Sequence, residues 1–217
     1  MGQAGLLEIQ IRGRRGYRET LEEMQQFTET RDDQTRDALW LVEHPPVYTL
    51  GLATNPAHLL ATGSIEVIQT DRGGQVTYHG PGQVLAYLLL DVRRAGLHVR
   101  ETVARLEQAS IDLLQSLGCP SACRMPGAPG VYVQEPQWPA LSKIAAVGLR
   151  IRRGCSFHGM SLNVDMDLSP FEGIHPCGMP GLRTVDLATI GVNLSWEQAA
   201  EQLGQSIQNA LQRSHAS

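Results

Sequence analysis

The stretch that decides the fold reads Asp71-Arg-Gly-Gly-Gln-Val-Thr-Tyr-His-Gly-Pro-Gly-Gln-Val-Leu-Ala-Tyr87. It holds four of the chain's 22 glycines and continues into an apolar run over residues 84–92. Adjacent glycines let the backbone approach a ligand closely and expose its N–H groups, and the Gly-Pro-Gly segment predicts a turn. The pattern predicts a ligand-binding loop that leads into a central strand buried on both faces. The alternative is a glycine-rich hairpin in which Tyr78 and His79 only fill space.

Length and composition predict a single domain over residues 1–217. The chain has 42% hydrophobic residues, enough for a sizeable core, and a net charge of −4. That charge gives no general attraction to nucleic acid or to an anionic membrane. No secretory signal is visible, and no run of about 18 apolar residues occurs. We therefore expect a cytoplasmic location and four reduced cysteines, at positions 119, 123, 155 and 177.

Hydrophobic periodicity predicts alternating strands and helices along the chain. Strands are expected at 6–11, 38–42, 65–69, 84–92, 130–133, 142–153 and 156–164, the last two pairing across Gly154, and residues 44–51 are expected to form a turn that leads into an extended segment. Helices are expected from residue 16, over 102–117, and after a capping box at Ser195–Gln198. A short helical turn is expected near 56–60, and irregular structure over 121–130 and 165–183. This order predicts an α+β domain with a mixed or mainly antiparallel sheet.

Cys177 and Lys143 are the candidate catalytic residues. Cys177 lies among prolines and glycines in Ile174-His-Pro-Cys-Gly-Met-Pro-Gly181, a loop that can present a thiol to a substrate. Lys143 is the only lysine of the chain and begins an apolar strand. A nearby ammonium favours the thiolate form of a cysteine. The alternatives are a buried structural cysteine and a lysine at a strand end that reaches solvent.

Two other uses of these residues stay open at this stage. Cys155, His158, His175 and Cys177 supply the ligand types of tetrahedral zinc. However, residues three apart on a strand face opposite ways, and one residue between His175 and Cys177 is tighter than usual spacing. Nucleophilic catalysis with His79 or His158 as the base is the second alternative.

Several blocks of the sequence together resemble the octanoyltransferases of lipoate biosynthesis, the lipoyl(octanoyl) transferase family. These blocks are residues 72–87, 130–133, 142–148, 157–164 and 176–178, with 44–51 also similar, so the resemblance extends from about residue 6 to 210. It implies an α+β fold with a mixed or antiparallel sheet flanked by helices, similar to the biotin and lipoate protein ligase catalytic domain. It implies no metal and no cofactor. Tyr132 stands where tryptophan is common, and Ser161 where alanine is common.

The resemblance also assigns roles to individual residues. Cys177 falls on the nucleophile of the family and Lys143 on the lysine that lowers the nucleophile's pKa. The residues that contact the acyl substrate carry over to Arg72, Gly73, Gly74, Gln75, Val76, Thr77, Tyr78, His79, Ala146, Val147, Gly148, Gly159, Met160 and Ser161.

The implied reaction moves an octanoyl group from octanoyl-acyl carrier protein to Cys177 and then to a specific lysine of a lipoyl domain. The implied acceptors are the lipoyl domains of 2-oxoacid dehydrogenase E2 subunits and the glycine cleavage H protein, and the reaction would be the first step of endogenous protein lipoylation. Backbone N–H groups near Gly73–Gly74 or Gly178 are expected to bind the oxyanion. The arginines at 93–94 and 150–153 are expected to steer acidic partner domains. The alternative function is an ATP-dependent lipoate or acyl-protein ligase of the same fold, which would not need Cys177.

Overall fold

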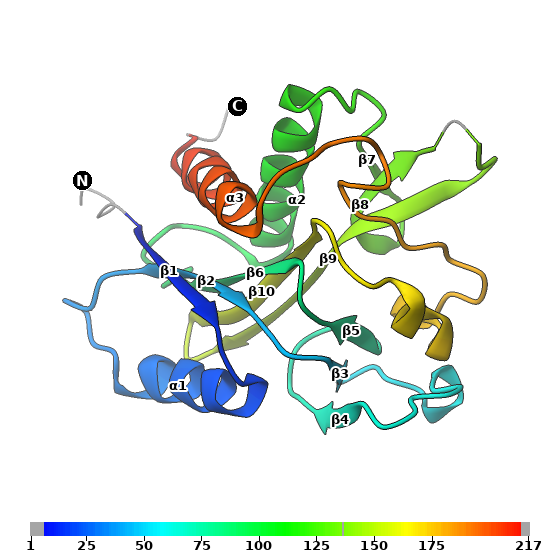
Figure 1. The fold of residues 1–217 in the computed structure, drawn as a ribbon. Helices are drawn as coiled ribbons and strands as arrows, with labels where there is room; N and C mark the ends of the chain where they lie inside the picture. The colour runs from blue at the N-terminus through cyan, green and yellow to red at the C-terminus, as the bar shows by residue number, and fades with distance from the viewer. Residues whose placement is uncertain (1–6, 136, 214–217) are drawn as a thin grey trace.

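The computed structural model describes residues 7–135 and 137–213. Within them the main sheet has seven strands in the order β1-β2-β6-β10-β9-β8-β7 (Figure 1). β1 pairs with β2 in parallel, and the other neighbours pair antiparallel. The sheet is therefore mixed and the fold α+β, as the sequence predicts. In chain order the strands are β1 Glu8–Arg14, β2 Ala38–Glu43, β6 Gln83–Leu89, β7 Cys123–Met125, β8 Ala128–Gln134, β9 Leu141–Arg152 and β10 Cys155–Asn163.

Helices cover both faces of this sheet. α2 (Val99–Ser116) and α3 (Trp196–Gln212) lie together on one face, and α1 (Tyr17–Thr30) lies on the other (Figure 1). None of the helices that the described residues form is both long and apolar enough to cross a membrane. The predicted capping box is present at the start of α3, where Ser195 Oγ accepts from the Gln198 N–H at 3.2 Å and Gln198 Oε1 accepts from the Ser195 N–H at 2.9 Å.

β6 is the central strand that the apolar run predicts. All of its residues are buried. Val84, Ala86 and Leu88 pack in the core beneath α2 and α3, while Leu85 and Leu89 pack with Met24 of α1 in a second core cluster. The lack of polar alternation in this run follows from helices covering both faces of the sheet.

A second, three-stranded sheet lies beside the main sheet in the order β4-β3-β5 (Figure 1). Its strands are β3 Val47–Leu50, β4 Glu66–Gln69 and β5 Thr77–His79. β5 lies inside the glycine-rich stretch, where the sequence predicts only a loop and a turn. Three residues are too few for a visible alternation pattern, so strand pairing with β3 decides this segment.

The segments expected to be irregular contain more structure than predicted. The expectation for residues 121–130 is wrong, because β7 and the start of β8 form an antiparallel pair there. Residues 165–183 hold two short 3-10 turns, η2 (Ser169–Gly173) and η3 (Pro176–Gly178). The helical turn expected near 56–60 is confirmed as η1 (Pro56–His58).

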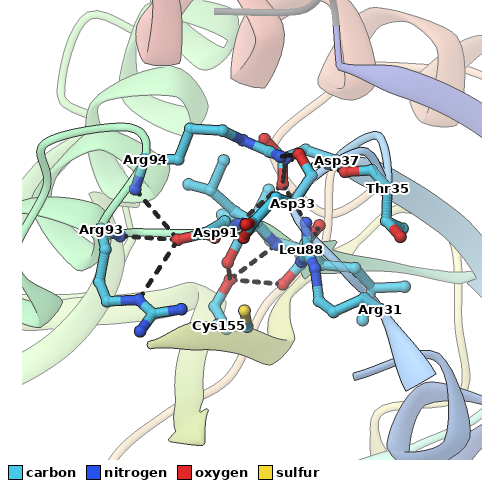
Figure 2. A network of polar contacts seen from close by, with 12 residues as sticks. Arg31, Asp33, Thr35, Asp37, Leu88, Asp91, Arg93, Arg94 and Cys155 are labelled. Atoms are coloured by element: carbon cyan, nitrogen blue, oxygen red, sulfur yellow. Dashed lines mark hydrogen bonds and ion pairs between the residues drawn. The ribbon is translucent and has the colours of Figure 1, made fainter. Parts of the chain in front are cut away.

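A polar network joins the end of α1, the start of β2 and the end of β6 (Figure 2). The Asp37 carboxylate binds Arg31 at 2.6 Å and Arg94 at 2.9 Å, and it accepts the Asp91 N–H at 2.7 Å. Cys155 is buried beside this network through its bridge to Asp91. Arg94 is thus paired with Asp37 while its side chain stays partly exposed, and the expected steering role of the arginines at 93–94 and 150–153 stays a prediction.

Candidate active site

The structure brings Lys143 and Cys177 into contact although 34 positions separate them. Lys143 Nζ lies 2.8 Å from Cys177 Sγ. Lys143 projects from β9, and Cys177 lies in η3. The backbone of this loop is held against the glycine-rich stretch, because the Cys177 N–H donates to Val76 O at 3.3 Å. Lys143 and Cys177 are called the dyad below.

Lys143 is buried, with 3% of its surface exposed. Its ammonium also donates to Pro129 O at 2.8 Å and lies 5.1 Å from the centre of the Tyr132 ring. Burial by itself lowers the pKa of Lys143, but the negative charge of the Cys177 thiolate, with a smaller effect of Tyr132, outweighs burial and raises that pKa above its ordinary value. The ammonium is therefore the stable form of Lys143 beside a thiolate.

Gly130 makes room for the Lys143 side chain. A Cβ at this position would lie 2.6 Å from Lys143 Cε and 2.5 Å from Ala145 O, and the residue has φ +131°. Its N–H donates at 2.8 Å to Glu107, a carboxylate of α2. The block at 130–133 is thus part of the wall around the lysine.

Cys177 has a left-handed backbone, with φ 56° and ψ 22°. This conformation costs a residue with a Cβ on the order of 1–3 kcal/mol and is concentrated at functional sites. Pro176 before it and Gly178 after it, with φ +72°, hold the chain in this turn. The surrounding loop therefore fixes the direction of the thiol.

A central pocket opens beside Cys177 and encloses about 490 Å³, part of it open to solvent. Among the substrate-binding residues implied by the resemblance, it is lined by Arg72, Gly74, Gln75, Val76, Thr77, His79, Ala146, Val147, Gly148, Gly159, Met160 and Ser161. Most of the surface exposed inside the pocket is apolar, although Arg72, His79 and Ser161 also line it. The pocket thus suits an apolar chain whose reactive end lies at Cys177.

Two residues of the implied set do not line the central pocket. Tyr78 points to the other side of β5, where its ring packs against Tyr48 at 5.5 Å and Phe171 at 5.4 Å between centroids. The side chains of β5 alternate, so His79 faces the pocket and Tyr78 cannot. Gly73 lies behind the wall, and its N–H donates to Leu149 O at 3.0 Å.

Arg72 is a buried cation in the wall of the central pocket, with 8% of its surface exposed. It donates to Thr49 Oγ1 at 3.1 Å, to Thr49 O at 2.6 Å and to Gly73 O at 3.0 Å. Within residues 7–135 and 137–213, no carboxylate forms an ion pair with it. Burial lowers the pKa of Arg72, although the charges of Tyr17 and Cys177 act in the opposite direction. A desolvated guanidinium without a counter-ion is suited to an anion that forms during a reaction.

His79 is held by hydrogen bonds on both ring nitrogens. Nδ1 lies 2.7 Å from Gln83 Oε1, and Nε2 lies 3.2 Å from Thr49 Oγ1. Because Gln83 Nε2 donates to Asn163 Oδ1 at 2.8 Å, Gln83 Oε1 faces His79 and accepts its Nδ1–H. Burial lowers the pKa of His79 to about 3. The neutral ring is therefore a structural part of the wall, and the partner of the Cys177 thiol is Lys143.

Other residues of the pocket wall were not in the implied set. They are Tyr17 from α1, Leu85 and Tyr87 from β6, and His158 from β10. The sequence places Tyr17 on the apolar stripe of its helix, where it is indistinguishable from a core residue. From the sequence, His158 is a candidate base or zinc ligand; in the structure its Nε2 lies 2.9 Å from Asp71 Oδ1.

The dyad lies in a smaller chamber of about 260 Å³ that shares Thr77, Ala146, Ser161 and Cys177 with the central pocket. The expected oxyanion donors are partly wrong, because the N–H groups of Gly73 and Gly178 are already bound, the latter to His175 O at 2.9 Å. No group of three or more His, Cys, Asp or Glu side chains in the described part of the chain is arranged to hold a metal ion.

The chain is similar to known proteins both in sequence and in fold. The family model of the lipoyl protein ligase A/B catalytic domain matches residues 16–208. An octanoyltransferase of Bordetella parapertussis is 57% identical, over 89% of this chain and 88% of its own length. An octanoyltransferase of Paraburkholderia phytofirmans is 53% identical, over 97% of this chain and 88% of its own length.

The chain belongs to the octanoyltransferases of the lipoyl protein ligase A/B family. Solved structures of distantly related ligases have the same fold as this octanoyltransferase. A bipartite lipoate protein ligase from Thermoplasma acidophilum has a TM-score of 0.69 at 14% identity, over 94% of this chain and 83% of that one. A biotin protein ligase from Aquifex aeolicus has a TM-score of 0.54 at 12% identity, over 95% and 69%. At such identities these structures bear on the fold alone.

Proposed function

We propose that this octanoyltransferase transfers an octanoyl group from octanoyl-acyl carrier protein to a lysine of a lipoyl domain, through a thioester on Cys177. The observation that carries the proposal is the 2.8 Å contact between Lys143 Nζ and Cys177 Sγ at the end of an apolar pocket. The name octanoyltransferase, which the similar proteins carry, supports octanoyl as the acyl group that is transferred. The acceptors are the lipoyl domains of 2-oxoacid dehydrogenase E2 subunits and the glycine cleavage H protein.

In the first step, the Cys177 thiolate attacks the carbonyl carbon of the donor thioester. The bond from that carbon to the donor sulfur breaks, and the donor leaves as a thiolate. The Lys143 ammonium supplies the proton that converts the leaving thiolate into a thiol. The octanoyl group remains on Cys177 as a thioester, and Lys143 is neutral. Covalent catalysis of this kind divides one difficult transfer into two easier steps.

In the second step, the neutral amine of the acceptor lysine attacks the Cys177 thioester. An amide bond forms, the carbon–sulfur bond breaks, and Cys177 leaves as a thiolate. Neutral Lys143 accepts the proton that the amine loses, which restores the ion pair. Lys143 is chosen over His79 because both ring nitrogens of His79 are engaged in the pocket wall.

The charge that develops on the carbonyl oxygen needs donors in both steps. Arg72 supplies a buried positive charge in the same wall. The Gly74 N–H makes no hydrogen bond among the described residues, unlike the N–H groups of Gly73 and Gly178. We assign Arg72 and Gly74 to oxyanion stabilisation, which in enzymes acts in sites that exclude water.

The octanoyl chain occupies the central pocket. Burial of each methylene is worth about 0.8 kcal/mol, so the chain supplies several kcal/mol of binding free energy. Adding or removing one methylene changes the binding free energy by about 1–3 kcal/mol. A preference for eight carbons therefore depends on how well the length of the pocket matches the chain. Met160 lines this pocket from β10 and is fully buried.

Intact-protein mass spectrometry after mixing with octanoyl-acyl carrier protein tests the proposal. The expected result is an octanoyl adduct in the wild-type protein, in the absence of ATP, that is lost in Cys177→Ala. Cys155→Ala is the matched control, because Cys155 is buried away from the dyad beside Asp91. An adduct that persists in Cys177→Ala refutes the assigned nucleophile, and transfer that requires ATP supports the ligase alternative.

A further inference from the structure

A second opening of the dyad chamber has no role in the reaction as described so far. The chamber shares Phe171, Pro176 and Thr184 with an outer cleft that encloses about 1140 Å³, part of it open to solvent. The central pocket shares other residues with the chamber, among them Thr77 and Ser161. The dyad therefore lies between two openings: the central pocket on one side and the outer cleft on the other.

A thioester has one chain for each of these two openings. Its carbonyl carbon carries an acyl chain on one side and a sulfur-linked chain on the other. With the acyl chain in the central pocket and the carbonyl carbon at Cys177, the sulfur-linked chain must leave the dyad chamber by another route. The outer cleft provides such a route, because it shares lining residues with the dyad chamber.

One of the three residues that the dyad chamber shares with the outer cleft, Thr184, has an unsatisfied polar group. Thr184 Oγ1 is buried and has no hydrogen-bond partner among the described residues. Thr184 lies beside Lys143, because the two form a parallel bridge and the Val185 N–H donates to Lys143 O at 2.9 Å. A buried hydroxyl without a partner costs free energy, which a ligand that offers an amide group would recover.

The outer end of the cleft exposes apolar surface. Leu60 is 54% exposed and Trp138 is 40% exposed, and both line the cleft. The Arg183 guanidinium lies 5.1 Å from the Trp138 ring and is paired with Glu135, so this aromatic platform is held in place. Indole rings commonly present such a surface to ligands that contain amide groups.

We propose that the outer cleft binds the amide-containing, thiol-terminated arm that carries the donor's thioester, with Thr184 at the inner end and Trp138 at the outer end. This inference rests on the proposed function. A lysine of an acceptor domain is the competing occupant, since the exposed Glu172 carboxylate also lies on the cleft. The arm is favoured because the cleft has a buried, unpartnered hydroxyl at Thr184, which an amide would satisfy, and an exposed indole at Trp138, whereas the four methylenes of a lysine offer no amide to Thr184.

Single-turnover acylation of Cys177 by two octanoyl thioesters tests the inference. Octanoyl-pantetheine has the full arm with two amides, and octanoyl-N-acetylcysteamine has a short arm with one. We expect the wild-type protein to be acylated faster by the long arm. In Thr184→Val and in Trp138→Ala, the ratio of long-arm to short-arm rates falls by about 5- to 10-fold, the loss expected for one hydrogen bond or one stacking contact.

Matched controls come from the same chain. Thr54 also has a buried Oγ1 without a partner, and Leu52 is 59% exposed, yet neither lines the cleft. Thr54→Val and Leu52→Ala are therefore expected to keep the wild-type ratio. An unchanged ratio in Thr184→Val and Trp138→Ala overturns the inference. A slower transfer from acyl-Cys177 to a lipoyl domain, with normal acylation, also overturns it and assigns the cleft to the acceptor.

A binding measurement separates this inference from the proposed function. Titration calorimetry of pantetheine into Cys177→Ala reports on the cleft without any acyl transfer. Binding that is weakened about 5-fold or more by adding Trp138→Ala supports the inference even if neither thioester acylates the wild-type protein. Absence of pantetheine binding overturns the inference, whereas absence of a Cys177 adduct with binding intact overturns only the proposed function.

Discussion

At the scale of single residues, Lys143 is the most informative position because it is the only lysine in the chain. Its side chain is buried, which disfavours a charge, yet its partner is a thiol that can become a counter-ion. The two effects act in opposite directions on the lysine pKa. Removal of the Cys177 thiol is therefore expected to change the ionisation of Lys143.

This coupling gives a direct prediction for the Lys143 pKa. In wild-type protein we expect a value above the ordinary lysine value, because the Cys177 thiolate outweighs burial. In Cys177→Ser the thiolate charge is absent and only the smaller effect of Tyr132 opposes burial, so the pKa is expected to fall. Carbon NMR of lysine labelled at Cε measures both, since one side-chain signal is expected. A pKa that does not differ between the two proteins contradicts the ion pair.

Arg72 yields a second prediction for the reaction. Arg72→Met removes the buried positive charge from the pocket wall. Single-turnover acylation of Cys177 is expected to slow by about 100- to 1,000-fold, the effect of losing an oxyanion donor. Arg72→Lys keeps the charge but loses the forked contact with Thr49, so partial recovery is expected. Wild-type rates in Arg72→Met, with an unchanged far-ultraviolet CD spectrum, would exclude this role.

At the scale of elements, the network around Asp37 ties α1, β2 and β6 together (Figure 2). The Arg31 side chain is 4% exposed, so its charge depends on Asp37. Removing one partner of a buried ion pair leaves an uncompensated charge and costs about 3–5 kcal/mol. The network thus acts on stability at a distance from the dyad.

We therefore expect Asp37→Ala to lower the free energy of unfolding by about 3–5 kcal/mol. Urea denaturation measures the change. Glu66→Ala is the matched control, because the Arg18–Glu66 pair is 64% and 54% exposed and should contribute about 1 kcal/mol or less. Equal effects of the two substitutions would show that Arg31 finds another partner.

At the scale of the whole molecule, two buried histidines make stability depend on pH. Burial lowers the pKa of His44 to about 4 and that of His79 to about 3. Both rings take part in hydrogen bonds as neutral groups, His44 with Tyr87 Oη at 2.7 Å and His79 with Thr49 Oγ1 at 3.2 Å. In the unfolded chain their pKa returns to about 6.5. Between these values only the unfolded chain binds the protons.

The free energy of unfolding is therefore expected to fall as the pH decreases from about 6.5 toward 4, by about 1.4 kcal/mol per pH unit for each histidine. Above pH 7 both states are neutral at these positions, and the dependence disappears. Urea denaturation at a series of pH values measures the slope. His44→Asn should reduce it, whereas His98→Asn should not, since His98 is exposed. An equal slope in both variants would assign the effect to other groups.

The sequence predicted most of this fold because its long elements carry strong local patterns. The apolar run of β6, the stripe of α1 and the capping box of α3 each specify their structure within a few residues. β5 and β7, with three residues each, were missed because so short a segment has no periodicity and depends on its partner strand.

For the active site, sequence and tertiary structure contributed different parts. The sequence by itself determined which residues are the candidates for the chemistry: a lone lysine, a cysteine in a loop rich in proline and glycine, and a glycine-rich stretch. Only the tertiary structure decided their geometry, since the dyad contact, the packing of Tyr78 against Phe171 on the far side of β5 and the two openings of the dyad chamber arise from segments far apart in the chain. Residue types are local properties, whereas distances between side chains depend on how the sheets pair and how the loops pack against them.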